Sequence, residues 1–197
     1  MNMSRHGIRV GRTIVFLGIS GSGKGTQATR LLQVLPRSVD LSTGGTFRRI
    51  AARSNLVGRF TRGVLSRGGI MPYWAPAYVW LNAFFEQFKG DESLILDGAP
   101  RQVAEAEMMD DFMHDVGRPL PVAIYLKLSA RAARDRLLAR GRADDNARAI
   151  AGRFAFFQRN VRPVIAYYRQ HRRLITINGE QSPAEVWRDV RKALGLK

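Results

Sequence analysis

A glycine-rich segment that follows a short apolar run constrains the possible folds of this chain more than any other feature of its sequence. Residues 13–17 are followed by Gly18-Ile19-Ser20-Gly21-Ser22-Gly23-Lys24-Gly25-Thr26-Gln27, where a helical pattern begins. Glycines let consecutive backbone N–H groups point at phosphate oxygens, while the helix adds its positive dipole end and Lys24 a mobile charge. The segment predicts a nucleotide-phosphate site; a turn without function is the alternative.

Five apolar runs alternate with helical patterns, at residues 14–17, 39–41, 94–96, 122–126 and 174–177. Continuous apolar runs suit strands that are buried on both faces, and parallel strands need helical crossovers. The pattern therefore predicts an α/β fold with a parallel five-stranded sheet flanked by helices. We expect helices at residues 25–35, 46–52, 56–67, 76–88, 102–116 and 130–140, a long helix kinked at Pro163, and a capped helix at 183–194.

Composition narrows the class of protein. The 197 residues suit one domain, and no apolar stretch approaches the roughly 18 residues of a membrane span. Residues 1–12 lack the apolar core of a secretion signal, so we expect a cytoplasmic protein without membrane contact. The absence of cysteine excludes a zinc site built from thiolates, which leaves Mg²⁺ brought by nucleotide as the expected metal.

The net charge of +16 comes mainly from arginine. Guanidinium groups suit bidentate phosphate recognition, and so positive a field also attracts nucleic acid incidentally. Arginines outside any motif, such as Arg37, Arg59 and Arg118, are expected on a solvated surface.

Polar residues follow the third apolar run. Asp97 would lie at the carboxyl end of a buried strand beside the glycine-rich loop, where it could hold Mg²⁺ through water; capping the next turn is the alternative role. The segment continues as Asp97-Gly98-Ala99-Pro100-Arg101.

These motifs together resemble the adenylate kinase family, specifically its short-lid nucleoside monophosphate kinases. Lys24-Gly25-Thr26-Gln27 is similar to the end of that family's phosphate loop, and residues 97–101 resemble its D-G-[FY]-P-R signature with Ala99 in place of the aromatic residue. Ser42-Thr43-Gly44 with Arg48 resembles S-T-G-D-x-x-[LF]-R, with Gly45 where Asp is usual. The resemblance extends over residues 13–194 and implies a P-loop NTPase-like fold.

The resemblance also implies roles for individual residues. The donor ATP would contact Gly21, Ser22, Gly23, Lys24, Gly25, Thr26, Arg136, Arg140 and Gln181. The acceptor AMP would contact Thr43, Arg48, Gly69, Ile70, Met71, Gly98, Arg101, Glu105, Arg142 and Arg153. The catalytic charges would be Lys24, Arg101, Arg140, Arg142 and Arg153, with Asp144 and Asp145 holding the closed lid or neighbouring arginines.

The expected organisation is a single kinase domain over residues 1–197. Its core would comprise residues 13–45, 89–139 and 147–197, with an NMP-binding insertion at 46–88 and a short lid at 140–146. The implied reaction is reversible transfer from ATP to AMP, giving two ADP, by a monomeric enzyme.

The sequence indicates the base of the acceptor nucleotide less clearly than the type of reaction. Glu105 stands where the family has a Gln that reads adenine. An ionised carboxylate only accepts hydrogen bonds, which suits guanine better than adenine. Glu105 could instead face solvent, with Gln102 reading the base. A kinase for GMP, UMP or CMP is one alternative, and a nucleic-acid-binding protein with a basic face over residues 131–173 is another.

Overall fold

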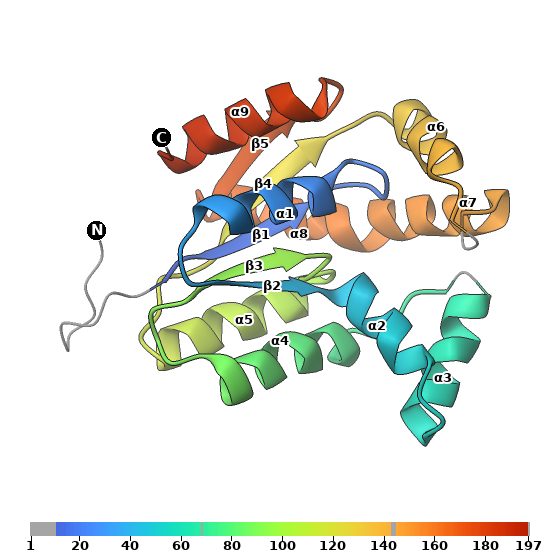
Figure 1. Cartoon of the computed structure of the whole chain (residues 1–197), viewed down its shortest axis with the longest axis horizontal. Helices are drawn as coiled ribbons and strands as arrows, with labels where there is room; N and C mark the ends of the chain where they lie inside the picture. Colours follow the sequence, from blue (N-terminus) through green and yellow to red (C-terminus); the bar gives the residue numbers. More distant parts are fainter. Residues whose placement is uncertain (1–10, 68, 143–144, 197) are drawn as a thin grey trace.

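The computed structural model describes residues 11–67, 69–142 and 145–196 (Figure 1). Its centre is a five-stranded sheet in the order β2-β3-β1-β4-β5, in which every neighbouring pair is parallel. The strands are β1 (Thr13–Leu17), β2 (Ser38–Ser42), β3 (Ser93–Asp97), β4 (Val122–Lys127) and β5 (Leu174–Asn178). This confirms the predicted parallel sheet.

Helices cover both faces of the sheet and bury an apolar layer on each (Figure 1). One layer includes α1 (Lys24–Val34) and α9 (Pro183–Leu194). The other includes α4 (Trp74–Gln87), α5 (Val103–Asp115) and α8 (Arg162–Gln170). Because β1 and β3 are buried on both faces, their side chains read as continuous apolar runs.

Two sets of helices extend beyond the carboxyl ends of the strands (Figure 1). The first is formed by α2 (Thr43–Ala51) and α3 (Leu56–Ser66), and the second by α6 (Ala130–Arg140) and α7 (Ala147–Phe156). Helix α2 begins three residues earlier than expected, because the Ser42 hydroxyl accepts a hydrogen bond from the Gly45 N–H at 3.3 Å and caps it.

The long helix before β5 has an irregular middle. A π-helical segment, η1 (Phe157–Val161), separates α7 from α8, and Pro163 stands in the first turn of α8. Pro163 has no N–H to donate to the preceding turn, so the regular hydrogen-bond ladder cannot run through this point. The interruption therefore lies just ahead of the proline.

Arg118 contradicts the expectation of a solvated arginine, because only 8% of it is exposed. It donates hydrogen bonds to the carbonyl oxygens of Glu92 (2.7 Å), Gly90 (2.9 Å) and Gly11 (3.2 Å). Two phenylalanine rings also lie against its guanidinium group. Arg118 therefore joins the segment before β1 to the one before β3, which spacing in the sequence did not indicate.

Replacing Arg118 by alanine should lower the free energy of unfolding by about 3 kcal/mol, because three carbonyl groups lose their donor. Urea denaturation measures the change. Arg59, exposed and outside the core, provides the matched control: Arg59→Ala should change stability by less than about 0.5 kcal/mol. Equal effects of the two substitutions would contradict the structural role of Arg118.

Candidate active site

The glycine-rich loop connects β1 to α1 at the carboxyl edge of the sheet. Gly18, Gly21 and Gly23 all have positive φ, which lets the chain curl back. The Lys24 ammonium donates to the carbonyl oxygens of Gly18 (3.0 Å) and Ile19 (3.1 Å). Burial lowers the pKa of Lys24, while neighbouring Asp97 opposes that shift.

The carboxyl end of β3 holds Arg101 by a short chain of hydrogen bonds. The Thr43 hydroxyl donates to the Gly98 carbonyl at 3.0 Å and accepts from the Arg101 guanidinium at 3.3 Å. Gly98 has φ +89°, and a Cβ there would lie 2.7 Å from the Thr43 oxygen, so this tight approach requires glycine. Arg101 also donates to the Gly98 carbonyl. Its guanidinium is thereby fixed in direction.

Asp97 lies where β3 meets both neighbouring strands. It pairs with Phe16 of β1 and with Ser42 of β2. A Cβ at Gly25 would come within 3.2 Å of an Asp97 carboxylate oxygen. Gly25, which stands where phosphate loops usually carry Ser or Thr, is therefore close to the carboxylate, and a side chain there would require the carboxylate to shift slightly.

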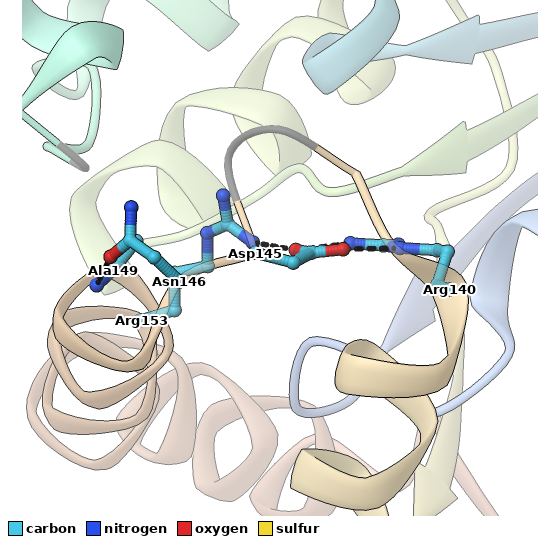
Figure 2. A network of polar contacts seen from close by, with 5 residues as sticks. All are labelled: Arg140, Asp145, Asn146, Ala149 and Arg153. Atoms are coloured by element: carbon cyan, nitrogen blue, oxygen red, sulfur yellow. Dashed lines mark hydrogen bonds and ion pairs between the residues drawn. The ribbon is translucent and has the colours of Figure 1, made fainter.

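The segment between α6 and α7 is held by one buried carboxylate (Figure 2). Asp145 accepts two hydrogen bonds from Arg140, at 2.8 and 2.9 Å, and one from Arg153 at 2.8 Å. Its side chain is 1% exposed, and these bonds, led by those from Arg140, lower its pKa. Asp145 thus holds two arginines beside each other, whereas the expectation for Asp144 lies outside the described residues.

A cavity of about 950 Å³ opens between these elements. Lys24 and Arg101 face the same cavity, which Arg140, Arg142 and Arg153 also line. The predicted residues that line it are Gly21, Gly23, Lys24, Gly25, Thr26, Arg48, Gly69, Ile70, Met71, Asp97, Gly98, Arg101, Arg136, Arg140, Arg142, Arg153 and Gln181. Segments more than a hundred residues apart in the sequence thus meet at one site.

Three predicted residues are buried behind the cavity wall. Ser22 is 2% exposed, and Thr43 and Glu105 are 0% exposed. Thr43 acts on the site through Arg101, as described above. None of the three lines the cavity as it stands in this structure.

Glu105 is a buried carboxyl beneath Arg101, so the alternative of a solvent-facing side chain is wrong. Its Oε2 accepts a hydrogen bond from the Arg101 backbone N–H at 2.7 Å. Among the described residues, its Oε1 and the buried indole N–H of Trp80 form no hydrogen bond of good geometry. Burial raises the pKa of Glu105 to about 7, against the opposing effect of Arg101.

Several residues that line the cavity were not predicted from the sequence. Asp40 lines the cavity from β2, and burial followed by the charge of Asp97 raises its pKa. A carboxylate inside an apolar run was a signal that could have identified it. Glu180, Ser182 and Pro183 also line the cavity, and no local pattern pointed to them.

Backbone amides, a lysine and several arginines converge here at the carboxyl edge of a parallel sheet, so the cavity is suited to two sets of phosphate groups. Together, this fold and site define a P-loop nucleotide phosphotransferase.

Comparisons with known proteins agree with this class. The family model for adenylate kinase matches residues 16–173. An adenylate kinase of Thermus thermophilus is 33% identical over 191 residues, covering 95% of this chain and 99% of that protein. One of Parvibaculum lavamentivorans is 34% identical, covering 93% and 92% of the two chains, and one of Leuconostoc mesenteroides is 31% identical, covering 93% and 97%. The chain belongs to the adenylate kinase family.

Glu105 should make stability depend on pH. Because its pKa is higher in the folded protein than in the unfolded chain, the folded state holds the proton longer, and stability should fall as pH rises from about 4.5 to 7. Each pKa unit corresponds to about 1.4 kcal/mol, so the decline should reach about 3 kcal/mol. Glu105→Gln, which keeps an acceptor for the Arg101 N–H, should remove it.

Urea denaturation across this pH range compares the two proteins. Other carboxyls contribute to both curves equally, so the difference between them isolates Glu105. Parallel curves would contradict a raised pKa for this residue.

Proposed function

We propose that this protein catalyses reversible phosphoryl transfer from ATP to AMP, producing two ADP. The observation that carries the proposal is that Lys24 and Arg101, which follow the neighbouring strands β1 and β3, line one cavity. Phosphoryl transfer needs little covalent help from the protein. It needs donor, acceptor and counter-charge aligned in a site that excludes water.

The donor phosphates would bind the loop of residues 18–26. Lys24 now donates to two loop carbonyls, and it would exchange these for phosphate oxygens. Arg136 and Gln181 both line the cavity and lie beside each other, since the Arg136 guanidinium donates to the Gln181 carbonyl at 3.4 Å. The adenine of ATP would lie against this pair.

The acceptor would occupy the half between β3 and the α2–α3 lobe. Arg101, which is anchored to Thr43 and Gly98, would grip its phosphate together with Arg48. Residues 69–71 also line the cavity and would contact the base or ribose. Fixing Arg101 in advance lowers the entropic cost of binding.

The lid arginines would neutralise charge on the migrating group. Arg140, Arg142 and Arg153 line the cavity, and Asp145 holds two of them in a fixed pair. Preorganised guanidinium groups stabilise developing charge without reorganising during the reaction. Closure of the insertion at 46–88 and the lid at 140–146 would exclude water.

Asp97 and Asp40 are suited to Mg²⁺ that arrives with ATP. Both carboxylates line the cavity beside the phosphate loop, and Mg²⁺ at such sites is usually held by one or two carboxylates, water and substrate phosphates. When bound, Mg²⁺ would neutralise phosphate charge. Asp97 would orient it through water.

A coupled assay for ADP tests the proposed activity. Lys24→Ala should lower kcat/KM by at least about 100-fold, because the donor phosphates lose their main charged partner. Exposed Lys89 lies outside the cavity, so Lys89→Ala serves as control and should leave turnover unchanged. Absence of transfer to any ribonucleoside monophosphate would refute the proposal.

AMP is the proposed acceptor in spite of Glu105. The neutral carboxyl carries one donor and one acceptor, as an amide does, and a pKa of about 7 populates that form near neutral pH. The buried, hydrogen-bonded position of Glu105 therefore weakens the case for guanine that a permanently ionised carboxylate would make.

Comparing kcat/KM for AMP and GMP tests this choice. We expect AMP to be preferred by at least about 100-fold, because a mismatched base would leave buried polar groups unpaired. Equal efficiencies would mean that Glu105 relaxes selection, and a preference for GMP, UMP or CMP would overturn AMP as acceptor.

None of the described helices has the length and apolar character needed to cross a membrane. The predicted monomeric state, cytoplasmic location and division into core, insertion and lid remain part of the proposal.

A further inference from the structure

The exposed aromatic side chains of the described residues all lie in one part of the chain. They are Phe60, Tyr73, Trp74, Tyr78 and Phe85, with exposures between 45% and 79%. Large exposed rings are costly in water, and their concentration marks a candidate interaction surface. The surface belongs to α3 and α4, on the side of the molecule that carries the α2–α3 lobe (Figure 1).

Two of these rings stack on each other across the two helices. Phe60 of α3 and Trp74 of α4 have centroids 6.2 Å apart and planes inclined by 25°. Trp74 and Tyr78 lie one turn apart on the same face of α4. A separate small core of Phe47, Met71, Ala75 and Val79 supports the lobe, so the exposed rings are not needed to fill it.

Two arginines of α3 and its C-cap belong to the same part of the surface. An added Cβ at Gly63 would lie 3.8 Å from the guanidinium of Arg67, which places that charge over the α3 turn after Phe60. Arg59 precedes Phe60 and is exposed, and its guanidinium donates to the Ser54 carbonyl at 2.9 Å. We call Arg59, Phe60, Arg67, Trp74 and Tyr78 the aromatic–arginine surface.

The surrounding charge has one sign. Residues 41–85 contain six arginines and no aspartate, glutamate or lysine. Among the residues that the structure describes, none of these arginines forms an ion pair. A surface of this kind attracts polyanions, and the rings give such a ligand flat apolar groups to stack on.

We expected any nucleic-acid face in the basic stretch at residues 131–173. This stretch differs from the aromatic–arginine surface in the ion pairs of its arginines and in the exposure of its rings. Several of its arginines are engaged: Arg140 and Arg153 bind Asp145, and Arg173 binds Asp110. No aromatic side chain described in this stretch is among the exposed ones.

We propose that the aromatic–arginine surface binds single-stranded nucleic acid. Bases would stack on Trp74 and Tyr78 while Arg59 and Arg67 contact phosphates, the combination used for sequence-tolerant binding of single strands. A membrane-binding helix would segregate its charges from its apolar face. Here the Arg67 guanidinium lies over the α3 turn that follows Phe60, so a charge and a pair of stacked rings are neighbours, which favours a ligand that carries both phosphates and bases.

This binding is separate from the proposed kinase reaction. None of the five residues of the surface lines the cavity, so both ligands have room at once. The binding experiment is accordingly run with the cavity saturated by diadenosine pentaphosphate, and turnover is measured independently. Absence of kinase activity in the unsubstituted protein would refute the proposed function alone.

The test is fluorescence anisotropy of a labelled oligouridylate of about 16 nucleotides, the upper range of single-strand sites per domain. The full-length protein should bind it with steep salt dependence. Phe60→Ala with Trp74→Ala should weaken binding about 10-fold or more. Arg59→Gln with Arg67→Gln should reduce the slope of log affinity against log salt by about 0.7 for each phosphate that is no longer neutralised.

The control removes two charges elsewhere: Arg131→Gln with Arg134→Gln on α6, both exposed and outside the cavity. It should lower affinity far less than the Arg59/Arg67 pair. Equal losses would mean non-specific attraction and overturn the proposal. So would displacement of the oligonucleotide by diadenosine pentaphosphate, or binding to phosphatidylserine vesicles without binding to the oligonucleotide. A far-UV circular dichroism spectrum and a urea midpoint equal to those of the unsubstituted protein verify that each variant folds.

Discussion

The site depends on the parallel pairing of β1 with β3. This pairing sets Phe16 opposite Asp97, although the two residues lie 81 positions apart in the sequence. Both strands end at the same edge of the sheet, so the phosphate loop that follows β1 and the arginine-bearing turn that follows β3 open onto a common space. The helix pairs α2–α3 and α6–α7 enclose a site whose position the ends of β1 and β3 define.

Such a concentration of positive charge opposes its own burial. Burial lowers the pKa values of Lys24 and Arg101, so each cation loses some of the stabilisation it has in water. Buried or partly buried carboxyls offset this cost: Asp97 near Lys24, Glu105 under Arg101 and Asp145 between Arg140 and Arg153. Asp145 also fixes two guanidinium groups in position by hydrogen bonds, which is what alignment of two anionic nucleotides requires.

Local patterns predicted the elements better than the environments of single side chains. The five apolar runs all became strands, and burial of β1 and β3 on both faces explains why their runs are continuous. Arg59 and Arg118 looked equivalent in the sequence, but one is exposed and the other donates to carbonyls from distant segments. The earlier start of α2 also depended on a single hydroxyl, Ser42, whose capping role no periodicity reveals.

The sequence by itself determined the class of chemistry. A glycine-rich loop followed by lysine, and an Asp-Gly-x-Pro-Arg turn after a buried strand, carry their meaning locally, since backbone conformation and residue type are enough to indicate phosphate binding. Only the tertiary structure decided which charged side chains contact one another. Whether Glu105 faces solvent or Arg101, whether Asp145 holds one arginine or two, and whether rings and arginines gather on one surface all depend on how distant segments pack. Burial and pairing are properties of the folded chain, and no short stretch of sequence contains them.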